Sequence, residues 1–302
     1  MSNQTFILIL SGIIGILSGL AAVILKQGVH SIQHFLTEGF YKEYANFLYI
    51  IYPLIGILAA YLLGKYIFKD GGGHGIPDIL FTISKKQSII ARVKTYSRVF
   101  TSAITVGFGG SVGLEAPMLV TGSAIGSNVG SLVHLNAKKR TLLIGCGAAA
   151  AISSIFGAPI GGVIFAIEVI MMEISTASFI PLLIASVTGS LTSMVLIGKD
   201  SVFNFKLTES FQASHMPYYL LLGISCGLVS LYFSQAVRKT ESLMASFDSQ
   251  ALRILYGGAI LGIMVFFLPP IYGEGYDTLN TLIDGNSHQL LEKSPFFSII
   301  EN

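Results

Sequence analysis

The chain has 302 residues, of which 52% are hydrophobic and only 11% are charged. An ordinary soluble domain carries about 25% charged residues, so this composition excludes a soluble globular protein and indicates a protein embedded in lipid. The net charge is only +2, which is too small to indicate the extended basic surface that nucleic acid requires.

Charge-free stretches follow one another along the chain, and about 20 apolar residues are enough to cross a bilayer as a helix. The sequence therefore predicts an all-α polytopic membrane protein in which residues 1–302 form a single transmembrane domain surrounded by lipid. The first stretch has no Lys or Arg ahead of it, so we expect a retained anchor and not a cleaved signal peptide. The stretches are 1–25, 44–64, 99–114, 116–133, 141–167, 174–198, 210–237 and 254–273.

Residues 71–80, GGGHGIPDIL, are too interrupted for a plain spanning helix. Pro77 suits the first turn of a helix because its missing N–H would have no partner there. The free N–H groups and the positive dipole end of that turn would attract an anion. His74 is either a pH-sensitive donor to that anion or a turn residue with no further role, and both interpretations stay open.

Positive charge is concentrated in two loops. The positive-inside bias predicts that both loops are cytoplasmic. The alternative is that these charges are simply solvated and do not determine the orientation of the protein in the membrane. The basic residues are Lys85, Lys86, Arg92, Lys94 and Arg98 in the first loop and Lys138, Lys139 and Arg140 in the second.

Residues 107–117, GFGGSVGLEAP, repeat the order of glycines, then proline, then a helix. Two helix N-termini that face one another would replace part of an anion's water shell with backbone donors. Partial charges of this kind bind and release an anion, whereas a fixed cation would hold it too tightly. We therefore expect opposed helix ends without a buried Lys or Arg.

Glu115 lies at the start of the predicted helix, where a carboxylate in an apolar protein is costly without a partner or a function. Because it is an anion, it can occupy the N–H groups that the transported anion uses, and ion entry then requires its displacement or protonation. We interpret Glu115 as a gate, and the alternative is a simple partner of the helix dipole. Glu168, the second intramembrane acid, is expected to be buried with a hydrogen-bond partner, as a structural group or as a proton relay.

The chain begins a second copy of its first part near residue 217. GILSGLAAVILKQGV at 15–29 and GISCGLVSLYFSQAV at 223–237 are identical at 6 of 15 positions, including two glycines spaced by four. Residues 273–275 echo residues 73–75 in the same way. We therefore expect a first repeat over about 5–198 and a partial second repeat over about 210–302.

The counterpart of residues 107–117 would fall after about residue 307. We accordingly expect a missing C-terminal part in the same natural chain. Glycines spaced by four, such as Gly122, Gly126 and Gly130, predict close helix packing. Cys146 and Cys226 lie in apolar segments and are predicted to pack without a disulfide or a metal.

The run GGGHGIP resembles the GSGIP signature of the CLC family of chloride channels and transporters. GLEAP at 113–117 resembles its GREGP signature, and GAPIGGVIFAIE at 157–168 resembles the segment that closes its first half. The resemblance covers residue 5 to about 285. It implies an all-helical fold of inverted repeats with broken helices, a homodimer with one pore per subunit, and selectivity for small anions.

By position in these motifs, Glu115 corresponds to the family's external gating glutamate and Glu168 to its structural acid. Val169 occupies the position where proton-coupled exchangers carry an internal glutamate, and valine there resembles the channel members. The residues at anion-binding positions are Gly73, His74, Gly75, Ile76 and Pro77 for the central and inner sites, and Gly113, Leu114, Ala116 and Pro117 for the outer site.

Three departures leave the preferred anion open: His74 replaces a serine, Leu114 an arginine and Ala116 a glycine of the family motifs. The family's later GxFxP signature and its pore tyrosine have no counterpart, as an unfinished repeat predicts.

We expect passive transport of small anions, chloride first, through a pore gated by Glu115 in the plasma (cell inner) membrane. The alternatives are a proton-coupled anion antiporter and a non-conducting fragment with an assembly role. No enzymatic activity and no cofactor besides the transported anion are expected, because His74 and Glu115 have no nucleophile or metal ligand at a recognised spacing.

Overall fold

The computed structural model describes residues 3–38, 45–70, 75–170, 176–198 and 212–286, and its regular elements there are helical. Six of the described helices are long and apolar enough to cross a membrane, which confirms the polytopic all-α prediction. The α-helices are α1 Asn3–Glu38, α2 Ala45–Leu62, α3 Ile76–Lys85, α4 Ser97–Gly107, α5 Glu115–Leu132, α6 Ala137–Phe156, α7 Pro159–Val169, α8 Thr176–Ile197, α9 Met216–Ala245, α10 Gln250–Phe267 and α11 Tyr276–Ile283.

Two of the charge-free stretches, 99–114 and 116–133, are not among the six helices that are long and apolar enough to span a membrane. The charge-free stretch 99–114 does not form a spanning helix, because α4 ends at Gly107 and Gly109 adopts a φ of 89°. A turn with positive φ favours glycine, and here it ends α4 and leads the chain back to the first residue of α5. The spanning path is therefore broken at the GFGG sequence, as the glycine pattern of that segment indicated.

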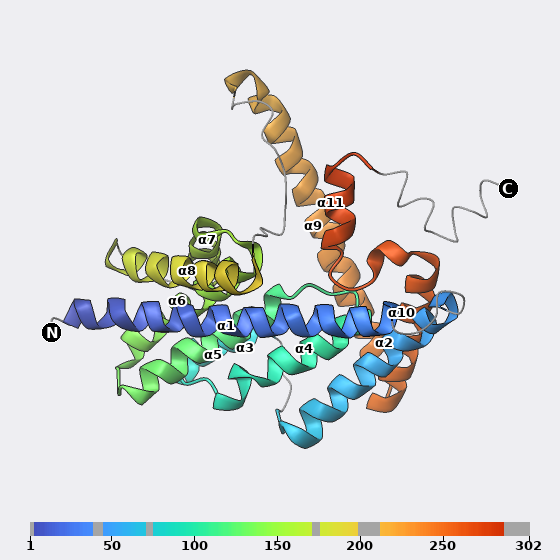
Figure 1. Ribbon diagram of the computed structural model, residues 1–302, viewed down its shortest axis with the longest axis horizontal. Helices are drawn as coiled ribbons and strands as arrows, with labels where there is room; N and C mark the ends of the chain where they lie inside the picture. The colour runs from blue at the N-terminus through green and yellow to red at the C-terminus, as the bar shows by residue number, and fades with distance from the viewer. Residues whose placement is uncertain (1–2, 39–44, 71–74, 171–175, 199–211, 287–302) are drawn as a thin grey trace.

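Helices α5 and α6 form the centre of the core, with α1 and α8 packed around them (Figure 1). A Cβ atom at Gly122 would lie 2.7 Å from Cβ of Ala151, and one at Gly126 would lie 2.6 Å from the carbonyl carbon of Leu143. Only residues without a side chain let two helices approach so closely. The prediction that these glycines serve packing is confirmed.

The two basic loops lie at the same end of the helical bundle. An Arg140 guanidinium nitrogen donates to the carbonyl oxygen of Gln87 over 3.1 Å, and the hydroxyls of Ser88 and Thr141 are 2.7 Å apart. Both loops therefore face the same side of the membrane, in agreement with the prediction that they share one orientation. Their cytoplasmic orientation stays a prediction.

Helices α9, α10 and α11 follow the same order of long, medium and short helices as α1, α2 and α3, while the division into two repeats stays a prediction. Helices α2 and α10 both have 18 residues. Helix α11 begins at residue 276 and α3 at residue 76, an offset of 276 − 76 = 200. Gly275 and Gly75, which precede these two helices, both have positive φ, at 77° and 68°. Their ψ angles differ, at 1° and −116°, so the position of the glycine recurs but its backbone conformation does not.

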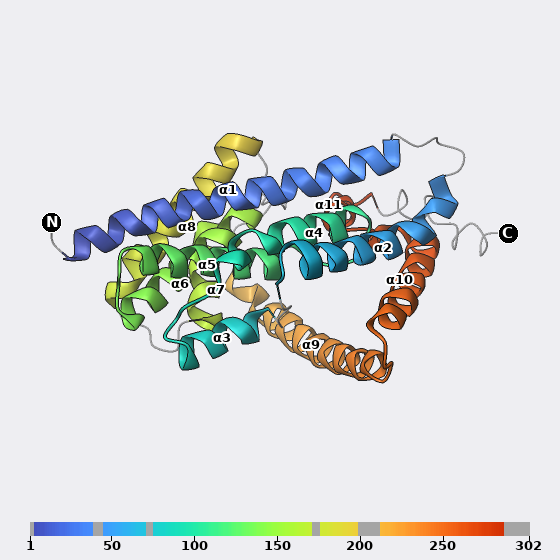
Figure 2. The ribbon, with the colours of Figure 1, turned by 90° about the horizontal axis from the view of Figure 1, so that it is seen from below.

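The equivalent helices have different surroundings. Helix α1 runs along one side of the bundle and packs on α6 and α8, whereas α9 stands apart from the bundle in both views (Figures 1 and 2). Cys146 on α6 is buried, but Cys226 on α9 is exposed. The packing prediction thus holds for the first cysteine and is wrong for the second, because no described segment covers that part of α9.

Candidate functional site

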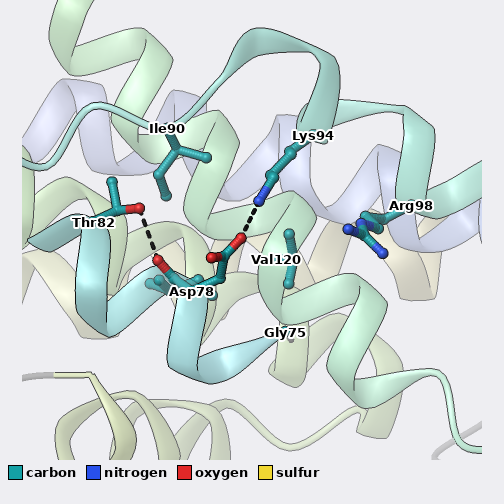
Figure 3. Close-up of a pocket in the computed structure, with 8 residues that line it drawn as sticks. Gly75, Asp78, Thr82, Ile90, Lys94, Arg98 and Val120 are labelled. Carbon is teal, nitrogen blue, oxygen red and sulfur yellow. Dashed lines mark hydrogen bonds and ion pairs between the residues drawn. The ribbon is translucent and has the colours of Figure 1, made fainter. Parts of the chain in front are cut away.

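The first candidate helix end is the N-terminus of α3. Gly75 precedes the helix, Ile76 is its half-buried first residue and Pro77 is exposed in its first turn. Gly73 and His74 lie outside the described residues, so their predicted roles stay predictions. Gly75 and Val120 of α5 line the same small pocket (Figure 3). Val120 is five residues after Glu115, or about 7.5 Å along the helix axis, so the α3 end lies beside the second turn of α5.

Two basic side chains lie beside the α3 end, and both are ion-paired. Lys94 donates to the Asp78 carboxylate (Figure 3), and Nε of Arg98 is 3.2 Å from a carboxylate oxygen of Asp70. The Lys94 hydrogen bond lowers the pKa of the Asp78 carboxyl. Because each cation has its own carboxylate, neither acts as a free charge at the helix end.

The second helix end is the N-terminus of α5. Leu114 precedes the helix and is fully buried, and Glu115 is the half-buried first residue. The Glu115 side chain folds back over Gly113, where a Cβ atom would lie 2.7 Å from the carboxylate carbon. A glycine at 113 therefore makes room for the carboxylate. Ala116 is exposed and Pro117 is half-buried in the same turn.

A segment of the second repeat, YGEGY at 272–276, closes over the α5 end. Tyr272 donates to the carbonyl oxygen of Gly107 over 3.1 Å, and its ring lies on Gly109, where a Cβ atom would come within 2.7 Å of it. The Tyr276 hydroxyl donates to Oε1 of Glu115. The glycine-rich segments 107–117 and 272–276 are thus in contact, and the hydrogen bond between Tyr276 and Glu115 joins them.

A basic residue that sequence analysis missed also lies here. Lys26 of α1 donates to the carbonyl oxygen of Ile155 over 2.6 Å. The next residue, Phe156, packs edge-on against Tyr276 with ring centroids 6.1 Å apart. Lys26 is therefore a cation near the Glu115–Tyr276 contact, and the expectation of helix ends without a buried Lys or Arg stays a prediction. Lys26 follows a long apolar run, and this interruption was the signal that could have revealed it.

Glu274 lies between the two tyrosines of this segment. Burial raises its pKa to about 7, with the charges of Glu115 and Asp277 acting in the same direction and that of Lys26 acting against them. Glu274, Tyr276 and Lys26 line a cavity of about 670 Å³ between α1 and residues 272–280. The echo of residues 73–75 at 273–275 pointed to this segment, but gave no role to Glu274 or Tyr276.

Helix α7 carries the two remaining candidates. Glu168 is exposed, so the prediction of a buried acid with a buried partner is wrong. The buried residues of α7 are Gly162, Val163 and Ala166, and a position two residues after Ala166 is turned about 200° from it on a helix. Val169 is half-buried at the end of the helix.

Comparison with known proteins identifies the family. The family model described as voltage gated chloride channel matches residues 55–300. The chain is 26% identical over 311 residues to chloride channel protein CLC-e of Arabidopsis thaliana, covering 94% of this chain and 42% of that protein. It is 24% identical over 293 residues to the H⁺/Cl⁻ exchange transporter ClcA of Vibrio cholerae, covering 92% of this chain and 62% of that protein. The chain therefore spans less than two thirds of the length of these relatives.

Solved structures show the same fold. A slow cyanobacterial Cl⁻/H⁺ antiporter superposes with a TM-score of 0.79 at 18% identity, covering 96% of this chain and 73% of that one. A CLC-type fluoride/proton antiporter superposes with a TM-score of 0.79 at 24% identity, covering 93% and 71%. The family match extends over more than half of the chain and includes the segments around Gly75, Glu115 and Glu274. The chain is therefore a multi-pass membrane protein that belongs to the voltage-gated chloride channel family.

Proposed function

We propose that this protein transports small anions across the membrane through a pathway that Glu115 gates. The observation that carries the proposal is the position of Glu115 at the N-terminus of α5, half-buried and bonded to Tyr276 of the second repeat. A carboxylate in this position occupies the place that the N-terminal N–H groups offer to an anion. Its displacement or protonation would free that place.

The charges around the helix ends support binding that is reversible. Lys94 and Arg98 are neutralised by Asp78 and Asp70, so the α3 end offers mainly backbone partial charges. Lys26 is close enough to Glu274 for their charges to interact. An anion would therefore meet a positive but not excessive potential, which lets it enter and leave.

Passive conduction is the first candidate mechanism, because Val169 cannot accept a proton at the position where exchangers of the family carry a glutamate. Proton-coupled exchange is the second, favoured by the likeness to ClcA and to the two antiporter structures. The purified protein in chloride-loaded liposomes distinguishes them. Passive conduction predicts chloride efflux without proton uptake, and proton uptake in a fixed ratio to chloride would establish exchange instead.

The transported anion is proposed to be chloride, with fluoride as the alternative suggested by the fluoride/proton antiporter. Efflux from liposomes loaded with equal concentrations of both anions measures the preference directly. Liposomes that release neither anion under any pH gradient would contradict the proposed function as a whole.

The finer assignments of location and assembly are also proposals. We infer a plasma membrane (cell inner membrane) location and a homodimer from the family resemblance, with one pathway in each subunit. Mass measurement of the detergent-solubilised protein tests the dimer. A mass equal to one chain at micromolar concentration would contradict it.

A further inference from the structure

We propose that Glu274 is a second proton-binding carboxylate of the gate and shares one proton with Glu115. In this arrangement Tyr276 holds Glu115 in place, Lys26 offsets part of the negative charge, and the cavity between α1 and α11 brings water to Glu274. The inference rests on the proposed role of Glu115 and adds a group that no motif assigns to the gate.

Geometry fixes Glu274 beside the gate. Tyr272 is anchored to Gly107 by a hydrogen bond of 3.1 Å, and Tyr276 is bonded to Glu115. Glu274 is the central residue between these two anchors, so its backbone cannot move away without breaking one of them. The glycines on either side have positive φ, 72° at Gly273 and 77° at Gly275, a backbone conformation that residues other than glycine rarely adopt.

The cavity gives Glu274 access to water. It has a volume of about 670 Å³ and is lined by α1, by Ile197 of α8 and by residues of the 272–280 segment, Glu274 and Tyr276 among them. A water molecule takes up about 30 Å³ of liquid, so the cavity has room for many. Protons can therefore reach Glu274 along hydrogen-bonded water.

The titratable groups around Glu274 come from three helices. Helix α1 contributes Lys26 and His30, α5 contributes Glu115, and α11 contributes Asp277. Burial and the two neighbouring carboxylates raise the pKa of Glu274 to about 7, although Lys26 opposes them. The Glu115 carboxylate is one of the charges that Glu274 senses, so a proton on Glu274 removes a negative charge from beside the gate.

The sharing of a proton gives opposite predictions for two substitutions. Removal of the Glu274 charge stabilises the charged form of Glu115, so more acid is needed to neutralise the gate. Removal of the Lys26 charge has the reverse effect. We therefore expect Glu274→Gln to move the pH of half-maximal anion flux downward by about one unit and Lys26→Gln to move it upward.

The flux experiment uses the full chain in liposomes between about pH 5 and pH 9. Asp284→Asn is the matched control, because Asp284 is exposed just beyond α11 and does not line the cavity. Its profile should coincide with that of the wild type. A Glu274→Gln profile that also coincides with the wild type, while Glu115→Gln still flattens the pH response, would overturn the inference and leave the proposed function standing.

Infrared titration of the purified chain tests the pair without any flux. The C=O band of a protonated carboxyl should appear with a midpoint near neutral pH, be lost in Glu274→Gln and shift to lower pH in Glu115→Gln. This result would support the shared proton even if liposomes showed no transport. A Glu274 midpoint at the ordinary value of about 4.3, or one that Glu115→Gln leaves unchanged, would overturn it.

Discussion

Helices α1 and α9 are copies of one sequence pattern in two different environments. In α1, a Cβ atom at Gly19 would lie 2.7 Å from the carbonyl oxygen of Gly189 and 2.8 Å from Cβ of Thr192. In α9, no other described segment comes within 4 Å of the same position at the equivalent Gly227. The pattern of small residues shows that a helix can be approached closely, but only the rest of the fold decides whether another helix is there.

The comparison extends to the whole of each repeat. The first repeat encloses its own core around α5 and α6, whereas the second repeat touches it through α10, which packs on α2, and through the 272–276 segment. Stability should therefore depend mostly on the first repeat, and the gate should depend on the few contacts between the two.

The largest expected effect comes from the equivalent glycines. Gly19→Leu forces α1 away from α8 and should lower the free energy of unfolding by about 3 kcal/mol. Gly227→Leu, its matched control, should change it by about 0.5 kcal/mol or less, because its side chain meets open surroundings. Unfolding in mixed detergent micelles measures both. Equal losses of unfolding free energy in the two variants would contradict the claim that only the α1 glycine is closely packed.

A smaller loss is expected where the second repeat packs on the first. A Cβ atom at Gly262 of α10 would lie 2.7 Å from the carbonyl carbon of Ile50 on α2. Gly262→Ala should therefore cost about 2 kcal/mol, and Gly223→Ala on the open helix α9 is its control. Thermal unfolding in detergent provides the measurement, and the comparison fails if the Gly223 variant proves the less stable of the two.

Tyr276→Phe removes the hydroxyl that bonds Glu115 and keeps the ring that packs on Phe156. A hydrogen bond of this kind contributes about 1 kcal/mol, so a modest loss of stability is expected. Tyr256→Phe is the control, since that tyrosine is 48% exposed on α10. Double-mutant cycles with Glu115→Gln measure the coupling, and full additivity would show that the two side chains do not interact.

The smallest effect concerns the Lys94–Asp78 pair within the first repeat. The Asp78 side chain is 37% exposed, so solvent screening limits the pair to about 0.5 kcal/mol. Because Lys94 lowers the pKa of Asp78, this contribution is present above the ordinary aspartate pKa and is lost as the pH falls through the lowered one. Lys94→Met should therefore lower the free energy of unfolding slightly at neutral pH and leave it unchanged at strongly acidic pH. Stability curves against pH check this, and a loss that grows in acid would contradict it.

Much of the fold could be predicted from the sequence, because long apolar runs and glycine spacing are local signals. The helical spans, the break near Gly109 and the repeat of α3 by α11 all follow from such signals. The exposure of Glu168 could not be predicted, since it depends on which face of α7 packs inward. The same limit explains Cys226, whose apolar helix is uncovered by any described segment.

The candidate site was predictable only in part. Motif position identified Glu115, but its partner Tyr276 lies 161 residues away, and no local pattern connects them. Lys26 stood out only as a charge after a long apolar run. Long-range contacts of this kind arise from the packing of the two repeats, which the sequence pattern does not specify.

The central claim is that the Glu115 carboxylate closes an anion pathway at the N-terminus of α5. Anion efflux from liposomes that contain the wild type or Glu115→Gln, measured at about pH 5 and about pH 8, tests it most directly. We predict that the variant conducts faster than the wild type at the higher pH and responds little to acid, since glutamine resembles the protonated gate. Wild-type rates and a wild-type pH response in the variant would contradict the claim.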